Sequence, residues 1–129
     1  MRVFEDMNSD RAKLEARKER YLRDPLPVRL GNLASNLARI KSTATQPELG
    51  EAAKRVIRES KYFVEWAGKD ADLQVQIELV ELQRQLARWQ LKWYEIWNDI
   101  EKRNSIAEQA GAWSEKILDR SGLLNSQVV

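Results

Sequence analysis

The stretch from residue 72 to residue 103 constrains the fold most, because it contains neither proline nor glycine. Apolar residues recur along it at alternating spacings of four and three: Val75, Leu79, Leu82, Leu86, Trp89, Trp93, Ile96 and Ile100. A repeat of seven residues is typical of a helix that packs lengthwise against another helix. We therefore predict one long central helix over 72–103, about 48 Å in length at ~1.5 Å per residue, with either Asp70 or Asp72 as its N-cap.

A second apolar set lies on another side of this predicted helix and comprises Leu73, Ile77, Val80, Ala87, Leu91 and Tyr94. Between the two sets runs a row spaced seven apart: Gln76, Gln83, Gln90 and then Trp97. The remaining strip is charged, and we expect it to be solvated: Glu78, Glu81, Arg88, Lys92, Glu95 and Asp99. Because apolar residues span more than half of the helical wheel, we expect neighbouring helices on at least two sides. At a helix–helix boundary the glutamine amides are expected to form hydrogen bonds with a tryptophan N–H or a neighbouring glutamine and to fix the register, with a polar lining for a small ligand as the alternative.

Proline, glycine and capping residues divide the rest of the chain. The prolines of "DPLP" at 24–27 end an N-terminal helix. Helices are predicted at roughly 28–42 and 46–67, the second beginning at a capping-box pattern of Thr45 and Glu48. A similar pattern at Ser105 and Glu108 predicts a last helix at about 105–121, although a single helix over 72–120 is also possible.

These elements predict an all-α protein, an antiparallel helical bundle of three to five helices. Gly122 suits the position just past the last helix. The bundle is expected to span 26–122. A charged N-terminal helix or arm at 1–25 would precede it, and a C-terminal tail at 123–129 would follow it.

The composition excludes several kinds of chemistry. The 129 residues include no cysteine and no histidine, so thiolate nucleophiles, serine–histidine triads and histidine-bound metal sites are impossible. We therefore expect a protein that is not an enzyme and that holds no cofactor or metal. No apolar run approaches the ~20 residues that span a bilayer, and "MRVFEDMNSD" has no apolar signal segment, so we expect a cytoplasmic protein without membrane insertion.

The aromatic end of the predicted long helix is the first candidate site. Trp89 should lie in the core, whereas Trp93, Trp97 and Ile100 would project past the shorter partner helices. Soluble proteins avoid exposing so large an apolar patch unless it binds something. Trp113 on the last helix, the N-terminal helix or a second copy of the chain are three possible covers. The candidate interface is therefore Trp93, Trp97, Ile100 and Trp113, in a possible homodimer.

A basic helix face is the second candidate site, and it comprises Lys54, Arg55, Arg58 and Lys61. It supports nucleic-acid binding as an alternative function, aided by the basic N-terminal arm. Nearby acidic residues dilute the charge, and the net charge of the chain is only +2, so a solvated surface is the plainer interpretation.

Three segments, "LPVRLGNLASNLARI", "VIRESKYFVEW" and "ELVELQRQLARW", resemble small uncharacterised all-helical proteins of cyanobacteria. The resemblance covers roughly residues 26–97. It implies a compact helical bundle and supplies no activity or functional residue. From the residues themselves we expect a structural or regulatory protein–protein interaction module that binds a protein partner or itself.

Overall fold

The computed structural model describes the backbone of residues 2–124 and the side chains of residues 6–124. Its elements are α1 (Arg2–Arg23), α2 (Leu26–Ala44), the 3-10 helix η1 (Pro47–Leu49), α3 (Gly50–Gly68), α4 (Leu73–Leu91), α5 (Trp93–Trp97) and α6 (Ile100–Ser121). Within the described residues the regular structure is entirely helical, which confirms the predicted all-α class. Most of the predicted tail at 123–129 lies outside the described residues.

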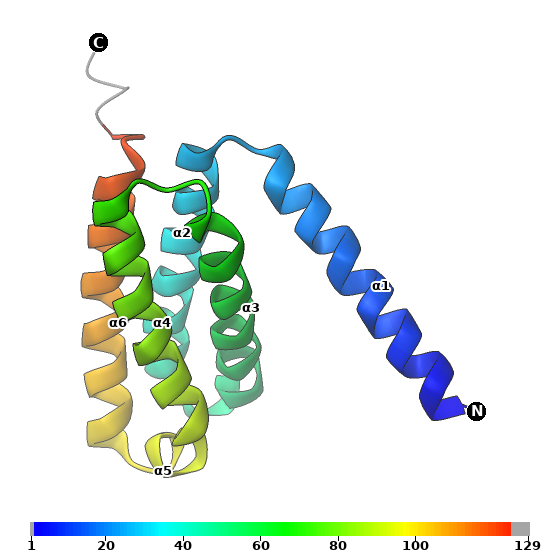
Figure 1. The fold of residues 1–129 in the computed structure, drawn as a ribbon. Helices are drawn as coiled ribbons and strands as arrows, with labels where there is room; N and C mark the ends of the chain where they lie inside the picture. Colours follow the sequence, from blue (N-terminus) through cyan, green and yellow to red (C-terminus); the bar gives the residue numbers. More distant parts are fainter. Residues whose placement is uncertain (1, 125–129) are drawn as a thin grey trace.

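Four helices of similar length form an antiparallel bundle, as predicted (Figure 1). α2 packs against α3 and α6, and α3 packs against α4. The short α5 lies across one end of the bundle, where the chain passes from α4 to α6 (Figure 1). Among the described helices, none is both long and apolar enough to cross a membrane.

α1 leaves the bundle at an angle and contacts it only through its C-terminal half, from Leu14 onward (Figure 1). At this elbow the buried ring of Tyr21 stacks on Phe63, with the ring centroids 4.2 Å apart. Its hydroxyl donates a hydrogen bond of 2.9 Å to the carbonyl of Arg29, whose guanidinium lies 2.9 Å from the Asp70 carboxylate. Burial raises the pKa of Tyr21 above its usual range. Aromatic stacking and a buried hydrogen-bond network therefore fix the elbow, while the rest of α1 projects.

The long central helix predicted over 72–103 is not present as one element. α4 ends at Leu91, α5 begins at Trp93 and α6 begins at Ile100, so the chain bends twice without proline or glycine. Helix propensity alone favours continuation, but a straight helix would leave the apolar residues after Leu91 beyond the ends of α2 and α3. The bends bring Trp93 and Ile96 into the core instead. Apolar burial thus outweighs the lost helical hydrogen bonds.

The start of the last helix also differs from the prediction. Asp99 caps α6, and its carboxylate accepts a hydrogen bond of 2.9 Å from the backbone N–H of Glu101. Ser105 therefore lies inside the helix, where its hydroxyl accepts a hydrogen bond from Gln109. The helix begins earlier than 105 because the second bend already places a good N-cap at 99.

Of the other predicted helix boundaries, those at Asp72 and Gly122 are confirmed and the one at Thr45 is wrong. Asp72 caps α4 by accepting a hydrogen bond from the N–H of Val75, and Gly122 ends α6 with a φ of 76°, both as expected. Thr45 does not cap the following helix, because its hydroxyl donates to the carbonyl of Ser42 at the end of α2. The chain then passes through η1 before α3 begins at Gly50.

Candidate functional site

The tryptophans at the end of α4 are covered by the chain itself. Trp93 is buried and stacks on Trp97, with the ring centroids 4.9 Å apart. Trp97 is half-buried, and its indole N–H donates a hydrogen bond of 2.9 Å to the carbonyl of Pro47. Its ring also lies directly over Gly50, where a side chain would collide with it. Trp89 is buried in the core, as predicted.

The four residues of the candidate interface do not share one surface. Ile100 is 64% exposed at the start of α6, whereas Trp93 is 5% exposed. Trp113 lies thirteen residues farther along α6, about 20 Å from Ile100 along the helix. Its half-buried ring has the ammonium group of Lys116 over it at 5.1 Å. A continuous aromatic interface at the end of the bundle is therefore not formed by these residues.

The four residues of the candidate basic patch do not line one common cavity. Lys61 donates a hydrogen bond of 2.7 Å to Gln90 on α4, and the ammonium group of Lys54 lies 5.4 Å from the ring centroid of Tyr94. Both lysines thus point toward α4 and α5. Arg58 lines one surface cavity together with Lys61, and it lines a neighbouring cavity of about 410 Å³ together with Arg55.

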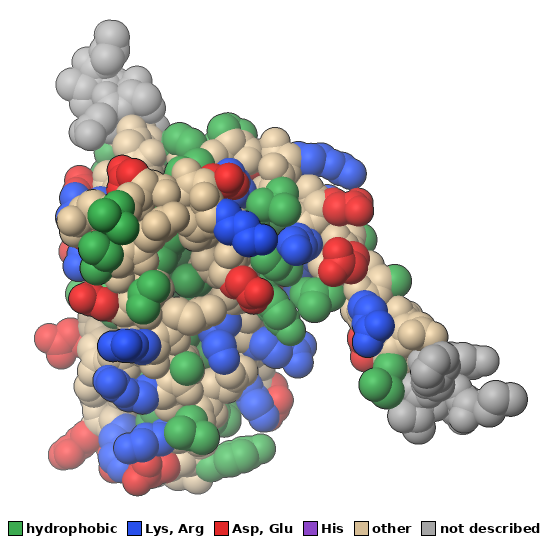
Figure 2. Space-filling view, viewed as in Figure 1, with side chains coloured by type: hydrophobic (Ala, Val, Ile, Leu, Met, Phe, Trp, Pro, Cys, Tyr) green, Lys and Arg blue, Asp and Glu red, His purple; other side chains and the backbone are tan. Residues whose placement is uncertain are grey.

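Two further arginines that sequence spacing could not place line the same cavity. Arg17 comes from α1 and Arg39 from α2, so three helices contribute to an arginine cluster of Arg17, Arg39, Arg55 and Arg58. Glu59 is the one carboxylate lining this cavity, and it forms an ion pair with Arg17 at 3.4 Å. Figure 2 shows basic side chains gathered on the surface between the bundle and α1.

The outward face of α4 is the largest departure from the predicted packing. The second apolar set was expected to contact another helix, but on α4 these side chains point to solvent. We call Leu73, Ile77, Val80, Ala87 and Leu91 the α4 stripe. The exposed fractions of its four larger members are 72% for Leu73, 49% for Ile77, 55% for Val80 and 84% for Leu91. In Figure 1 no other helix lies in front of α4, and Figure 2 shows hydrophobic side chains on the surface there.

The stripe lies opposite the core-facing side of α4. Val75, Leu79, Leu82, Leu86 and Trp89 are all buried and make up that inner side. α4 is therefore apolar on two opposite sides, and the described chain covers only one of them.

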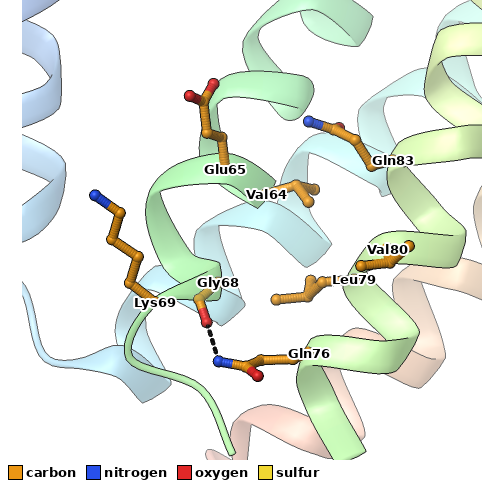
Figure 3. Close-up of a pocket in the computed structure, with 8 residues that line it drawn as sticks. All are labelled: Val64, Glu65, Gly68, Lys69, Gln76, Leu79, Val80 and Gln83. Carbon is orange, nitrogen blue, oxygen red and sulfur yellow. Dashed lines mark hydrogen bonds between the residues drawn. The ribbon is translucent and has the colours of Figure 1, made fainter. Parts of the chain in front are cut away.

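An apolar groove runs beside the stripe, between α3 and α4 (Figure 3). Its volume is about 430 Å³, and its apolar lining includes Val64, Leu79 and Val80. Val80 belongs to both the groove and the stripe, so the two surfaces are continuous. A ligand that covered the stripe could also place a side chain in the groove.

The glutamine row forms the polar edge of this groove and joins α4 to α3. Gln76 donates a hydrogen bond of 2.8 Å to the carbonyl of Gly68, and Gln83 donates one of 3.1 Å to the carbonyl of Lys61. Gln90 accepts the hydrogen bond from the Lys61 ammonium group. These amides do bond at a helix–helix boundary, as predicted, but their partners are two backbone carbonyls and a lysine of α3 rather than a tryptophan N–H or a neighbouring glutamine. The Oε1 atom of Gln83 is buried without a hydrogen-bond partner among the described residues.

Glu78 was expected in the solvated charged strip, but it is buried between α4 and α6. Arg120 donates two hydrogen bonds of 2.8 Å to its carboxylate, and Lys116 lies 4.0 Å away. The hydrogen bonds from Arg120 lower the pKa of Glu78 below its usual value. This pair cannot be recognised in the sequence, because α6 approaches α4 only in the folded bundle. Its role is structural, since it closes the edge between the two helices.

Residues suited to metal binding do not converge in the described part of the chain, where no group of three or more carboxylates could hold an ion. No protein-family model, curated protein or solved structure matches this chain. The resemblance to cyanobacterial helical proteins therefore stays a prediction, and the candidate sites must be judged on their geometry alone.

Proposed function

We propose that this chain is a non-enzymatic interaction module that binds a protein through the outward face of α4. The α4 stripe is the observation that carries the proposal. Scattered exposed aliphatic side chains are common on protein surfaces, but an apolar row at helical spacing, interrupted here only by Arg84, is typical of a docking surface. The absence of cysteine and histidine from the sequence supports a role without catalysis.

The exposed area of the α4 stripe determines how much free energy a bound partner would contribute by covering it. Full burial of a leucine, isoleucine or valine side chain stabilises by roughly 1.5–3 kcal/mol. The four larger stripe residues are between about half and four-fifths exposed. Covering them would therefore contribute about 4–8 kcal/mol, which is enough to offset part of the cost of association.

The shape of the surface favours a helical partner. With Arg84 included, the outward positions of α4 are spaced by four and three, and such a row matches the face of another helix lying along it. The adjoining groove provides room for a side chain from that helix.

A photo-crosslinking amino acid at position 87, in the stripe, tests the proposal in the native cell. We expect a defined protein adduct, identified by mass spectrometry, that is lost when Ile77→Glu is added. The same amino acid at position 108, on the exposed side of α6, serves as the control and should give no such adduct. An equal adduct pattern at 87 and 108, or no adduct at 87, would contradict docking through α4.

The arginine cluster supports a second candidate function, binding of a nucleic acid. Four guanidinium groups from three helices line one cavity, and only one of them is paired with Glu59. Arginine is well suited to phosphate because its planar group donates two parallel hydrogen bonds. The arginine cluster is therefore a better candidate site for nucleic-acid binding than the candidate basic patch on α3.

Fluorescence anisotropy with labelled single-stranded and double-stranded oligonucleotides tests this candidate. Binding should weaken steeply as salt rises, because each phosphate contact releases counterions. Replacing Arg39 and Arg55 with glutamate should abolish it, whereas replacing Lys116 on α6 should not. If no complex forms even at low salt, the nucleic-acid function is excluded.

A further inference from the structure

We infer that the partner of the α4 stripe is the α4 stripe of a second copy of this chain, packed antiparallel. This inference rests on the proposed docking function and names its partner. It depends on the order of residues along the stripe, on the sizes of those that would face each other and on two unpaired charges.

The spacing along the stripe is the same in both directions. From Leu73 to Leu91 the outward positions are 73, 77, 80, 84, 87 and 91, separated by four, three, four, three and four residues. Read from 91 back to 73, the separations repeat in the same order. A symmetric dimer of two antiparallel helices requires the same spacing in both directions. Across the two-fold axis, position 73 of one copy must face 91 of the other, 77 must face 87, and 80 must face 84. Here the axis would pass beside position 82.

The residues brought face to face complement each other in size. Leu73 would face Leu91 of the other copy, which pairs two large side chains at each end. Ile77 would face Ala87, which pairs a large side chain with a small one. Facing positions that alternate in size allow two helices to interdigitate closely.

The one charged position in the row decides the direction. Arg84 would face Val80 of the other copy, beside Glu81. Both Arg84 and Glu81 are exposed, and neither has an ion-pair partner within 4.0 Å among the described residues. In the antiparallel arrangement Arg84 of each copy meets Glu81 of the other, giving two pairs. In a parallel arrangement Arg84 would instead face Arg84, which is repulsive.

The area predicts a weak dimer. α4 is about 28 Å long at ~1.5 Å per residue, so the stripe alone covers less than the ~800 Å² per partner of a standard interface. We expect a dissociation constant on the order of 10–100 µM, with monomer at low concentration and dimer at high concentration.

Sedimentation equilibrium of the wild type, Glu81→Arg, Arg84→Glu and an equal mixture of the two variants tests the inference. In either variant alone, both cross-pairs become like-charged, so association should weaken by about tenfold or more. In the mixture, a heterodimer regains two opposite-charge pairs, and association should return to within about threefold of the wild type. Glu108→Arg, an exposed charge reversal on α6, should leave association unchanged, and circular dichroism should show that all variants fold.

Two results would overturn self-pairing. One is a wild-type chain that stays monomeric at about 500 µM, well above the expected dissociation constant. The other is a mixture that associates no better than either variant alone. The crosslink at position 87 separates the two proposals. An adduct with a different protein, together with a monomeric chain, removes self-pairing and leaves docking through α4 in place. The absence of both adduct and dimer removes both proposals.

Discussion

Replacing Gly50 with alanine tests whether Trp97 is held rigidly over the start of α3. A Cβ atom at position 50 would lie 2.7 Å from the indole nitrogen of Trp97 and 3.0 Å from its Cε2 atom. The ring cannot move aside freely, because it stacks on Trp93 and is hydrogen-bonded to the carbonyl of Pro47. Relief of the collision therefore requires loss of that hydrogen bond or a backbone shift.

Helix propensity and steric overlap change the stability of Gly50→Ala in opposite directions, and their sizes decide whether the variant is destabilised. Alanine in place of glycine favours a helix by roughly 0.5–1 kcal/mol. Overpacking costs about 1–3 kcal/mol, and the lost hydrogen bond costs about 1 kcal/mol. We therefore expect Gly50→Ala to lower the free energy of unfolding by about 1–3 kcal/mol, measured by urea denaturation followed by circular dichroism and tryptophan emission.

Gly68, at the other end of the same helix, is the matched control. A Cβ atom there would meet no heavy atom within 4 Å, so Gly68→Ala should be neutral or stabilise by up to ~1 kcal/mol. In a Trp97→Leu background the collision at Gly50 should largely disappear. If Gly50→Ala is as stable as the wild type, or if Trp97→Leu does not change its effect, the proposed packing of the indole over α3 is wrong.

Three further predictions concern polar contacts. Because Arg120 lowers the pKa of Glu78 in the folded state, the ion pair stabilises the protein above the pKa of the unfolded state, and this stability is lost as pH falls through the lower pKa of the folded state. Glu78→Gln should therefore cost about 1.5–3 kcal/mol at pH 7 and progressively less as pH falls below the unfolded-state pKa, by urea denaturation at a series of pH values; a loss that does not change with pH would contradict the ion pair. Asp99→Ala should lower stability by about 1 kcal/mol through loss of the α6 cap, whereas Ser105→Ala should change it by no more than about 0.5 kcal/mol. A larger loss for Ser105→Ala than for Asp99→Ala would show that the helix begins at 105. Tyr21→Phe should lower stability by about 1 kcal/mol in the same assay, because it removes the buried hydrogen bond from the hydroxyl to the Arg29 carbonyl; an unchanged midpoint would show that stacking alone holds the elbow.

The sequence by itself determines the helical class and most helix faces. The seven-residue repeat from Val75 to Trp89 is buried as predicted, and the glutamine row lies on the boundary with α3 as expected. Caps with local hydrogen bonds were also predictable, at Asp72 and Gly122. These features depend on residues within a few positions of each other, and helical periodicity reports on them directly.

Only the tertiary structure decided where the long apolar helix would bend and what would cover each of its sides. Trp97 leaves the helical path because its partners, Pro47 and Gly50, are distant in sequence and adjacent only in the fold. Glu78 is buried for the same reason, since Arg120 reaches it from α6. Helical periodicity marks a face as apolar, but whether that face is buried depends on how many helices the chain can place around it. Around α4 the described chain places too few helices, so the α4 stripe stays exposed.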